Sequence, residues 1–236
     1  MDDIALVTGA AGALGSEVAR TLQARGYGLA LVDAARSRER LEQLAASIGG
    51  ACVIAGDLGT QALWTEAMPR IERELGAAPA IAALVAGGWR GGKPLHEEDG
   101  DEVWRAMMDT NLETVHRSLR ALLPPMVARK RGSIVAIGSR AAIDPASSAR
   151  AAAYAASKAA TVALVQAVAA EVREHGVRVN AVLPSTMDTP ANRTAMPGAD
   201  PARWVSLPSA AGVVAFLLGD EARDISGAAI PVYGRS

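Results

Sequence analysis

Residues 4–15 read IALVTGAAGALG, an apolar run that passes directly into a glycine-rich turn. A short run that is apolar at every position is typical of a strand buried on both faces. Glycines let the backbone turn sharply and approach a pyrophosphate, and the helix expected at 13–25 offers free N–H groups and a positive dipole end. This context predicts a phosphate site rather than a turn without a ligand, with contacts at Gly9, Ala13, Leu14 and Gly15.

The alternation of strand and helix continues along the whole chain. Apolar runs predict further strands at 29–33, 51–57, 81–86, 133–139, 177–183 and 228–233. Longer patterns predict helices at 38–48, from the third strand to about Leu75, at 99–122 (ending near Pro124-Pro125), at 152–175 and at 208–218. We expect one α/β domain over residues 1–236, a doubly wound parallel seven-stranded sheet with helices on both faces. Its ligand should lie beyond the carboxyl ends of the strands.

The composition restricts the partners of this chain. It is half apolar, with a formal net charge of −1, so no basic surface predicts nucleic-acid binding. No apolar run approaches the roughly 20 residues that span a bilayer, and the acidic N-terminus does not resemble a signal peptide. Cys52 is the only cysteine, which excludes an internal disulfide and favours a reducing, cytoplasmic location. With one cysteine and three scattered histidines, we expect no metal site.

Acidic residues end the second and third predicted strands. Asp33 follows Gly15 by 18 residues and is placed to accept hydrogen bonds from an adenosine ribose. Its charge would repel a 2′-phosphate, so NAD(H) is favoured, while Arg36 and Arg38 leave NADP(H) possible. An ordinary turn aspartate is the alternative. The adjacent candidates for contacts to the adenine are Asp57 and Leu58.

The stretch YAASK, residues 154–158, places a tyrosine four residues before a lysine. On a helix these two side chains share a face. A tyrosine with an ordinary pKa near 10 needs a nearby positive charge to exchange protons near neutrality, and Lys158 is placed to supply it. Tyr154 is therefore a candidate general acid and base. Ser139, at the end of the fifth strand, is placed to hold a substrate oxygen, and Asn111 to orient a group near the lysine; alone, each would be an ordinary structural residue.

The set TGAAGALG (8–15), Asn111, Ser139 and Tyr154-x-x-x-Lys158, in this order, resembles the short-chain dehydrogenase/reductase family over essentially the whole chain. The resemblance implies a Rossmann fold, a nicotinamide cofactor, and hydride transfer at a carbonyl or alcohol carbon of a small molecule. It implies that Tyr154 is the acid/base, that Lys158 binds the nicotinamide ribose and lowers the tyrosine pKa, and that Asn111 supports a proton relay. Further implied cofactor contacts are Ala86, Gly87, Pro184, Met187 and Thr189. The family is commonly tetrameric, so we expect a homotetramer, or a dimer.

The chain departs from the family pattern at three places. Leu84-Val85-Ala86-Gly87 stands where the family often has Asn-Asn-Ala-Gly, and Ser185 stands where a glycine usually follows the proline. Ser139 and Tyr154 are two residues further apart than usual, which affects the geometry around 144–150. Candidate pocket residues are Trp89, Arg140, Met187 and Trp204. The irregular stretch 185–206 is expected to be a mobile lid over the substrate, with a rigid surface loop as the alternative.

Two alternative functions stay open. The stretches 85–92 and 182–204 resemble loops of dihydropteridine reductase, an NADH-using branch of the family, so a quinonoid dihydropteridine is a second substrate hypothesis. Ser139, which the animal enzyme of that branch lacks, favours ordinary carbonyl chemistry. A protein that senses the nicotinamide redox state by binding alone is the other alternative, and it would not need Tyr154, Lys158, Ser139 and Asn111 together.

Overall fold

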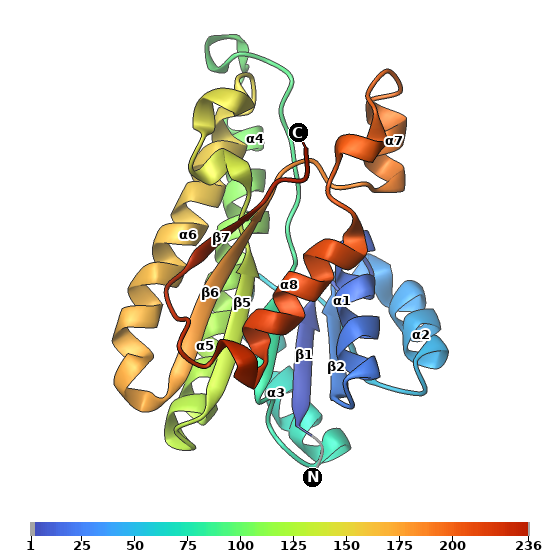
Figure 1. The fold of residues 1–236 in the computed structure, drawn as a ribbon, viewed down its shortest axis with the longest axis vertical. Helices are drawn as coiled ribbons and strands as arrows, with labels where there is room; N and C mark the ends of the chain where they lie inside the picture. Colours follow the sequence, from blue (N-terminus) through green and yellow to red (C-terminus); the bar gives the residue numbers. More distant parts are fainter. Residues whose placement is uncertain (1–2, 236) are drawn as a thin grey trace.

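The structure, a computed structural model, describes residues 3–235. Its centre is a parallel sheet of seven strands in the order β3-β2-β1-β4-β5-β6-β7 (Figure 1). The strands are β1 (Ile4–Thr8), β2 (Gly28–Asp33), β3 (Cys52–Ala55), β4 (Ile81–Leu84), β5 (Gly132–Ile137), β6 (Val177–Pro184) and β7 (Ala229–Val232). This confirms the predicted doubly wound α/β Rossmann-like sheet.

Helices cover both faces of the sheet, as Figure 1 shows. One layer holds α1 (Ala13–Ala24), α2 (Arg38–Ser47) and α8 (Leu207–Leu218), and the other holds α3 (Gln61–Leu75), α5 (Thr114–Ala128) and α6 (Ala152–Val172). Two short helices, α4 (Glu102–Met107) and α7 (Pro190–Ala195), lie in the connections near the carboxyl ends of the strands. The remaining segments are a π-helical turn, η3 (Met108–Glu113), and 3₁₀ turns at Ala35–Ser37, Leu95–Glu97, Arg140–Ala142, Pro145–Ser148, Arg173–His175, Pro201–Arg203 and Asp220–Ala222.

The continuous apolar strands contribute side chains to two hydrophobic cores, one on each face of the sheet. In β1, Ile4 and Leu6 join the core under α3, α5 and α6, while Ala5 and Val7 join the core under α1, α2 and α8. Side chains alternate between the faces of a strand, so a strand covered on both faces has no polar face. The chain reverses its winding between β1 and β4, which pair directly, and a crevice forms beyond the carboxyl ends of the strands at this point.

The helix expected at 99–122 is three segments, and it does not end at the prolines. The π-helical turn interrupts it between α4 and α5, and α5 continues through Pro124 and Pro125 to Ala128. Each proline removes one helical hydrogen bond. The last turn nevertheless forms because Leu122 and Met126 are fully buried against the sheet.

The third, fourth and fifth strands end two residues earlier than predicted, because the chain there turns into the crevice. The expected irregular stretch 185–206 also contains regular structure. Helix α7 begins at Pro190, and Thr189 caps it by accepting the Asn192 backbone N–H at 3.1 Å. A parallel bridge joins Met187 to Val205 at the base of the segment. Proline at the first helical position and a threonine cap are both helix-start signals.

One segment, Ala152–His175, is long and apolar enough to cross a membrane by length and composition, with a mean hydropathy of 1.3 in its apolar window. Half of that window is buried inside the molecule, where α6 packs against β6 and the π-helical turn. This is the helix predicted at 152–175, and polar residues such as Ser157 and Lys158 divide its apolar run. A core helix passes the same test, so this feature is weak evidence for a membrane.

Candidate active site

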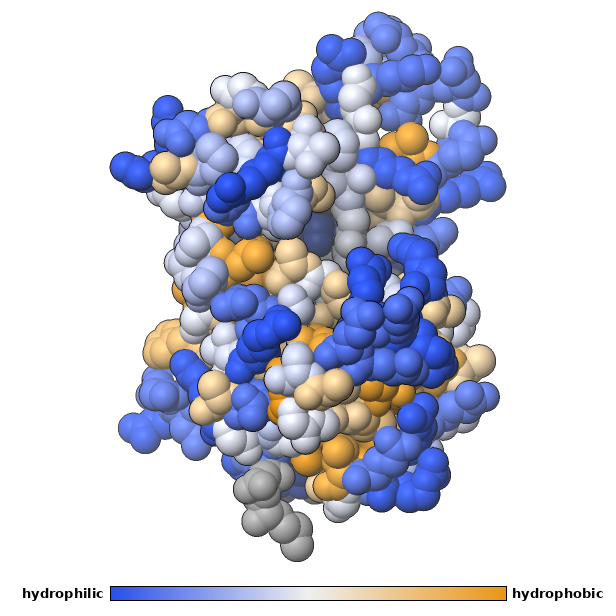
Figure 2. All heavy atoms as spheres, turned by 90° about the vertical axis from the view of Figure 1, so that its right-hand side faces the viewer, coloured by the Kyte–Doolittle hydropathy of each residue, from blue (hydrophilic) through white to orange (hydrophobic). Residues whose placement is uncertain are grey.

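A cavity of about 1360 Å³ lies beyond the carboxyl ends of the strands. Figure 2 shows the surface hollowed on the side that carries α2 and α7, with hydrophilic side chains on the rim. The cavity brings together nearly every predicted site residue: Gly9, Ala13, Leu14, Gly15, Asp33, Asp57, Leu58, Ala86, Gly87, Ser139, Tyr154, Lys158, Pro184, Met187 and Thr189. Asn111 is the exception, because it is fully buried beneath the wall.

The glycine-rich turn at the floor of the cavity is too tight for side chains. Gly9 has φ +64°, and a Cβ there would lie 2.7 Å from the Ala86 backbone nitrogen. A Cβ at Gly15 would overlap the Gly9 carbonyl oxygen. Helix α1 begins at Ala13, so its first N–H groups have no carbonyl one turn earlier to bind. These groups and the positive end of α1 make an anion cradle that fits a pyrophosphate.

Asp33 ends β2 at the edge of the same cavity. Its Oδ2 accepts the Ala11 backbone N–H at 2.9 Å, and its Oδ1 accepts the Ala34 N–H at 2.7 Å. These two donors fix the carboxylate at the end of the glycine-rich turn. Its unused lone pairs leave it able to accept hydrogen bonds from a ligand.

Three polar side chains in the segment that follows Asp33 line the cavity: Arg36, Ser37 and Arg40. Arg40 Nη2 donates to Ser37 Oγ at 2.9 Å. The sequence had suggested Arg36 and Arg38, but Arg38 lies 3.9 Å from Glu42, outside the cavity lining. Residues two apart on a helix point to nearly opposite sides, which explains why Arg40 replaces Arg38.

Ser139 and Tyr154 meet at the cavity wall. Ser139 Oγ accepts the Ala141 backbone N–H at 3.2 Å, and the Ser139 and Tyr154 side chains are hydrogen-bonded. Burial raises the pKa of Tyr154, and the hydrogen bond from Ser139 lowers it by less, so the net pKa is raised. The phenol is therefore protonated at neutral pH in this structure.

Lys158 lies on the same face of α6 as Tyr154 and is almost completely buried. Its Nζ donates to the Ile137 carbonyl oxygen at 2.8 Å. Burial lowers the pKa of Lys158 to about 8. Burial is the largest cause acting on the pKa of Tyr154, and Lys158 Nζ is directed at a strand carbonyl. The lowering of the tyrosine pKa by this lysine stays a prediction.

Asn111 acts on the backbone beside the lysine. It lies in the π-helical turn, where its Oδ1 accepts the Gly88 N–H at 2.9 Å and its Nδ2 donates to the Gly88 carbonyl at 3.1 Å. A Cβ on Gly87 would lie 2.9 Å from Asn111 Oδ1 and 3.2 Å from Lys158 Nζ. Asn111 therefore holds the turn after β4 against Lys158. The helical pattern of the sequence carried no signal for the π-helical turn that places it there.

The long segment between Ser139 and Tyr154 forms one side of the cavity mouth. Its two 3₁₀ turns contribute Arg140, Ser147 and Ser148 to the lining. Arg140 pairs with Asp144 at 3.0 Å and lies 5.5 Å above the centre of the Tyr233 ring. The expected pocket residues Trp89, Arg140 and Met187 line the cavity, whereas Trp204 lies outside its lining, with its backbone beside Gly234 of the C-terminal segment.

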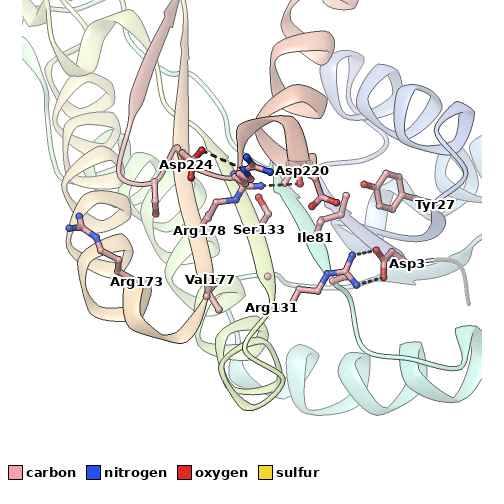
Figure 3. Close-up of a pocket in the computed structure, with 16 residues that line it drawn as sticks. Asp3, Tyr27, Ile81, Arg131, Ser133, Arg173, Val177, Arg178, Asp220 and Asp224 are labelled. Atoms are coloured by element: carbon pink, nitrogen blue, oxygen red, sulfur yellow. Dashed lines mark hydrogen bonds and ion pairs between the residues drawn. The ribbon is translucent and has the colours of Figure 1, made fainter.

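A second cavity, of about 590 Å³, lies at the amino ends of the strands (Figure 3). It is rich in charge, and two of its arginines, Arg131 and Arg178, form hydrogen bonds within the molecule. Arg131 pairs with Asp3 through two hydrogen bonds, and Arg178 donates to the carbonyls of Leu217 (2.6 Å), Leu218, Gly219 and Ile225. These contacts fix the end of α8 to β6.

Comparisons with known proteins find relatives in sequence and in structure. A family model described as short chain dehydrogenase matches residues 3–199. A 2,3-dihydro-2,3-dihydroxybenzoate dehydrogenase of Bacillus subtilis is 38% identical over 190 residues, 79% of this chain and 70% of that protein. A 2,5-dichloro-2,5-cyclohexadiene-1,4-diol dehydrogenase of Sphingobium indicum is 28% identical over 241 residues, 98% of this chain and 94% of that protein. The structure of carveol dehydrogenase from Mycobacterium avium in complex with NAD has a TM-score of 0.89 at 25% identity, covering 98% of this chain and 96% of that one.

Proposed function

The chain belongs to the short-chain dehydrogenase family, and we propose from this premise that it is an NAD(P)(H)-dependent oxidoreductase that interconverts a secondary alcohol and a carbonyl group. The observation that carries the proposal is one shared cavity. The glycine-rich cradle, Asp33 and the Ser139–Tyr154–Lys158 group all line it. A site for cofactor binding alone would need only the first two of these features.

The residues of the cavity fit a nicotinamide dinucleotide. The cradle at Gly9–Gly15 suits the pyrophosphate, Asp33 suits the adenosine ribose, and Lys158 suits the nicotinamide ribose. When bound, the nicotinamide supplies a hydride acceptor or donor. NAD(H) is favoured by the carboxylate of Asp33, and Arg36, Ser37 and Arg40 supply donors for a 2′-phosphate, so NADP(H) is a weaker second cofactor.

Tyr154 moves the proton of the reaction. In alcohol oxidation, its phenolate accepts the proton of the substrate hydroxyl as the C–H hydride leaves the same carbon; in reduction, its phenol returns that proton. Ser139 holds the substrate oxygen beside the phenol. Lys158 stabilises the phenolate once its ammonium group turns from the Ile137 carbonyl toward the reacting groups.

The substrate is proposed to be a small hydroxylated molecule. The relatives named above act on a dihydroxylated ring acid and a chlorinated cyclic diol, and Ser147 and Ser148 add hydroxyl groups to the cavity wall. Two other functions remain for the same experiments to separate: reduction of a quinonoid dihydropteridine, and nicotinamide sensing without turnover.

Fluorescence titrations with NADH and NADPH, followed by turnover assays with cyclic diols, sugar alcohols and quinonoid dihydropterin, test the proposal. We expect tighter binding of NADH than of NADPH, and NAD⁺ reduction with a diol. Failure to bind either nucleotide would overturn the oxidoreductase assignment. Binding without turnover of any substrate would favour the sensor, and turnover of the pterin alone would favour the pteridine reductase.

The proposed homotetramer and cytoplasmic location rest on family resemblance and cysteine usage. Sedimentation velocity of the purified protein and fractionation of the cells that express it would test the two proposals separately. A monomer in the first measurement would contradict the proposed homotetramer.

A further inference from the structure

Ser157 lies between Tyr154 and Lys158 and is completely buried. Its hydroxyl makes two hydrogen bonds with different partners. Ser157 Oγ donates to the Tyr154 carbonyl oxygen at 2.8 Å and accepts from Asn111 Nδ2 at 3.0 Å. The residue therefore links the helix that carries the reactive pair to the π-helical turn.

The direction of these two bonds matters. A serine hydroxyl has one proton, and here the Tyr154 carbonyl receives it. Toward Asn111, the Ser157 oxygen can then only accept. The amide of Asn111 must present its nitrogen to Ser157, which turns its oxygen toward the Gly88 N–H. Together with the N–H and carbonyl groups of Gly88, Ser157 thus determines which way the Asn111 amide faces.

A neighbouring threonine secures the same connection. Thr161 Oγ1 shares its one proton between the Ser157 carbonyl oxygen at 2.9 Å and the Asn111 carbonyl oxygen at 3.2 Å. Thr161 and Asn111 are both completely buried, where an unsatisfied polar group costs free energy. The backbone of the π-helical turn is therefore fixed to α6 independently of the Asn111 side chain, and replacement of Ser157 alone should leave that turn in place.

We propose that Ser157 is a positioning residue: by orienting the Asn111 amide, it holds the Gly87–Gly88 turn against Lys158 at the wall of the cavity. The turn packs so closely that a Cβ added at Gly87 would lie 2.9 Å from Asn111 Oδ1 and 3.2 Å from Lys158 Nζ, so a rotated amide displaces the backbone beside the lysine. The effect on turnover rests on the proposed function. The effect on nicotinamide binding rests only on the position of this turn in the cavity.

Ser118 shows how a helix serine without this role is arranged. It is also buried, and its Oγ donates to the Thr114 carbonyl at 2.6 Å. Among residues 3–235 no side chain donates to Ser118, and it lies outside the cavity lining. Ser118→Ala removes a similar buried hydroxyl and makes a matched control.

The test compares S157A, S118A, N111A and the double variant S157A/N111A by NADH titration and by alcohol oxidation. We expect S157A to lower kcat about tenfold, as the loss of roughly one hydrogen bond in the transition state does, with little change in KM for the alcohol. We expect its Kd for NADH to rise a few-fold, while S118A matches the wild type in both assays. In the N111A background, S157A should add almost nothing, because the two residues act through one amide.

Equal behaviour of S157A and S118A, or independent effects of S157A and N111A, would overturn the role of Ser157. S157C is the second variant if S157A melts early, since it keeps the volume but is a weaker acceptor; it should lie between S157A and the wild type. If the wild type binds NADH but oxidises no alcohol, the proposed function fails, and the NADH titrations still decide whether Ser157 positions the turn.

Discussion

The two ends of the sheet each carry a cavity with polar and charged walls, but they use those groups differently. At the amino ends, Arg131 is paired with Asp3, which joins the start of β5 to the start of β1, and Arg178 binds backbone carbonyls that join α8 to β6 (Figure 3). At the carboxyl ends, the first N–H groups of α1 have no partner within the helix, and Tyr154, which is hydrogen-bonded to Ser139, lines the cavity. Charge in a cavity therefore does not identify a functional site, whereas polar groups with unused hydrogen-bonding capacity do.

The comparison is tested most directly by removing one tyrosine hydroxyl from each of the two cavities. Tyr154→Phe should lower kcat by about 10²–10⁴-fold, the usual contribution of a positioned acid or base, with NADH affinity close to that of the wild type. Tyr27→Phe, in the amino-end cavity, should leave kcat unchanged. Steady-state kinetics and NADH titration measure both. Near-normal turnover by Y154F on a true substrate would remove the acid/base role.

Arg178→Met should have the opposite effect to Tyr154→Phe: it should lower the free energy of unfolding and leave kcat unchanged. The guanidinium binds the orphan carbonyls at the end of α8, and its loss should cost about 3 kcal/mol of unfolding free energy. Urea unfolding measures this, with kcat per folded molecule as the second readout. Arg223→Met, an exposed arginine of the same cavity, should change stability by less than about 0.5 kcal/mol. A large fall in kcat for folded R178M would contradict the division between the ends.

The buried ammonium group of Lys158 predicts a pH dependence of stability. Burial lowers its pKa to about 8 in the folded protein, from an ordinary value of 10.5 that the unfolded chain retains. Between these two values the unfolded chain binds the extra proton, so stability rises with pH. Wild-type unfolding free energy should therefore gain about 2 kcal/mol from this group between about pH 7.5 and 9.5. Lys158→Met should lack this gain. Parallel curves for the two proteins would show that the lysine is not shifted.

Asp33→Ala should give the smallest effect. The Kd for NADH should rise about tenfold, because the carboxylate no longer accepts from the ribose, while NADPH binding should hold or improve. Arg40→Ala should weaken NADPH binding alone. Asp3→Ala, at the other end of the sheet, should change neither constant. An unchanged ratio of the NADH and NADPH constants in D33A would exclude Asp33 from cofactor choice.

The sequence was most informative where the backbone has few choices. Uninterrupted apolar runs predicted the sheet, and the glycine-rich turn predicted the cradle, because few residue types satisfy either geometry. Residues fixed by helix phase and tertiary packing were harder: Arg40 takes the place expected for Arg38, and Trp204 packs outside the cavity. Asn111 was identified by resemblance, but the π-helical turn that directs it has no sequence pattern of its own.

The missed role of Ser157 has a different cause. Its hydroxyl matters only through partners 3 and 46 positions away in the chain, and no local pattern encodes the second of these. In the sequence it is one polar residue in an alanine-rich helix. Hydrogen bonds between residues that are far apart in the chain can be identified only from the three-dimensional structure.

The contact between the glycine-rich turn and the turn after β4 restricts how this chain can evolve. A Cβ at position 9 would meet the backbone nitrogen and Cα of Ala86, not its side chain. No second substitution at position 86 can therefore compensate for a first one at position 9, since every residue carries the same backbone. In a saturation mutagenesis library, Gly9 should remain intolerant in every genetic background that preserves the length of both turns.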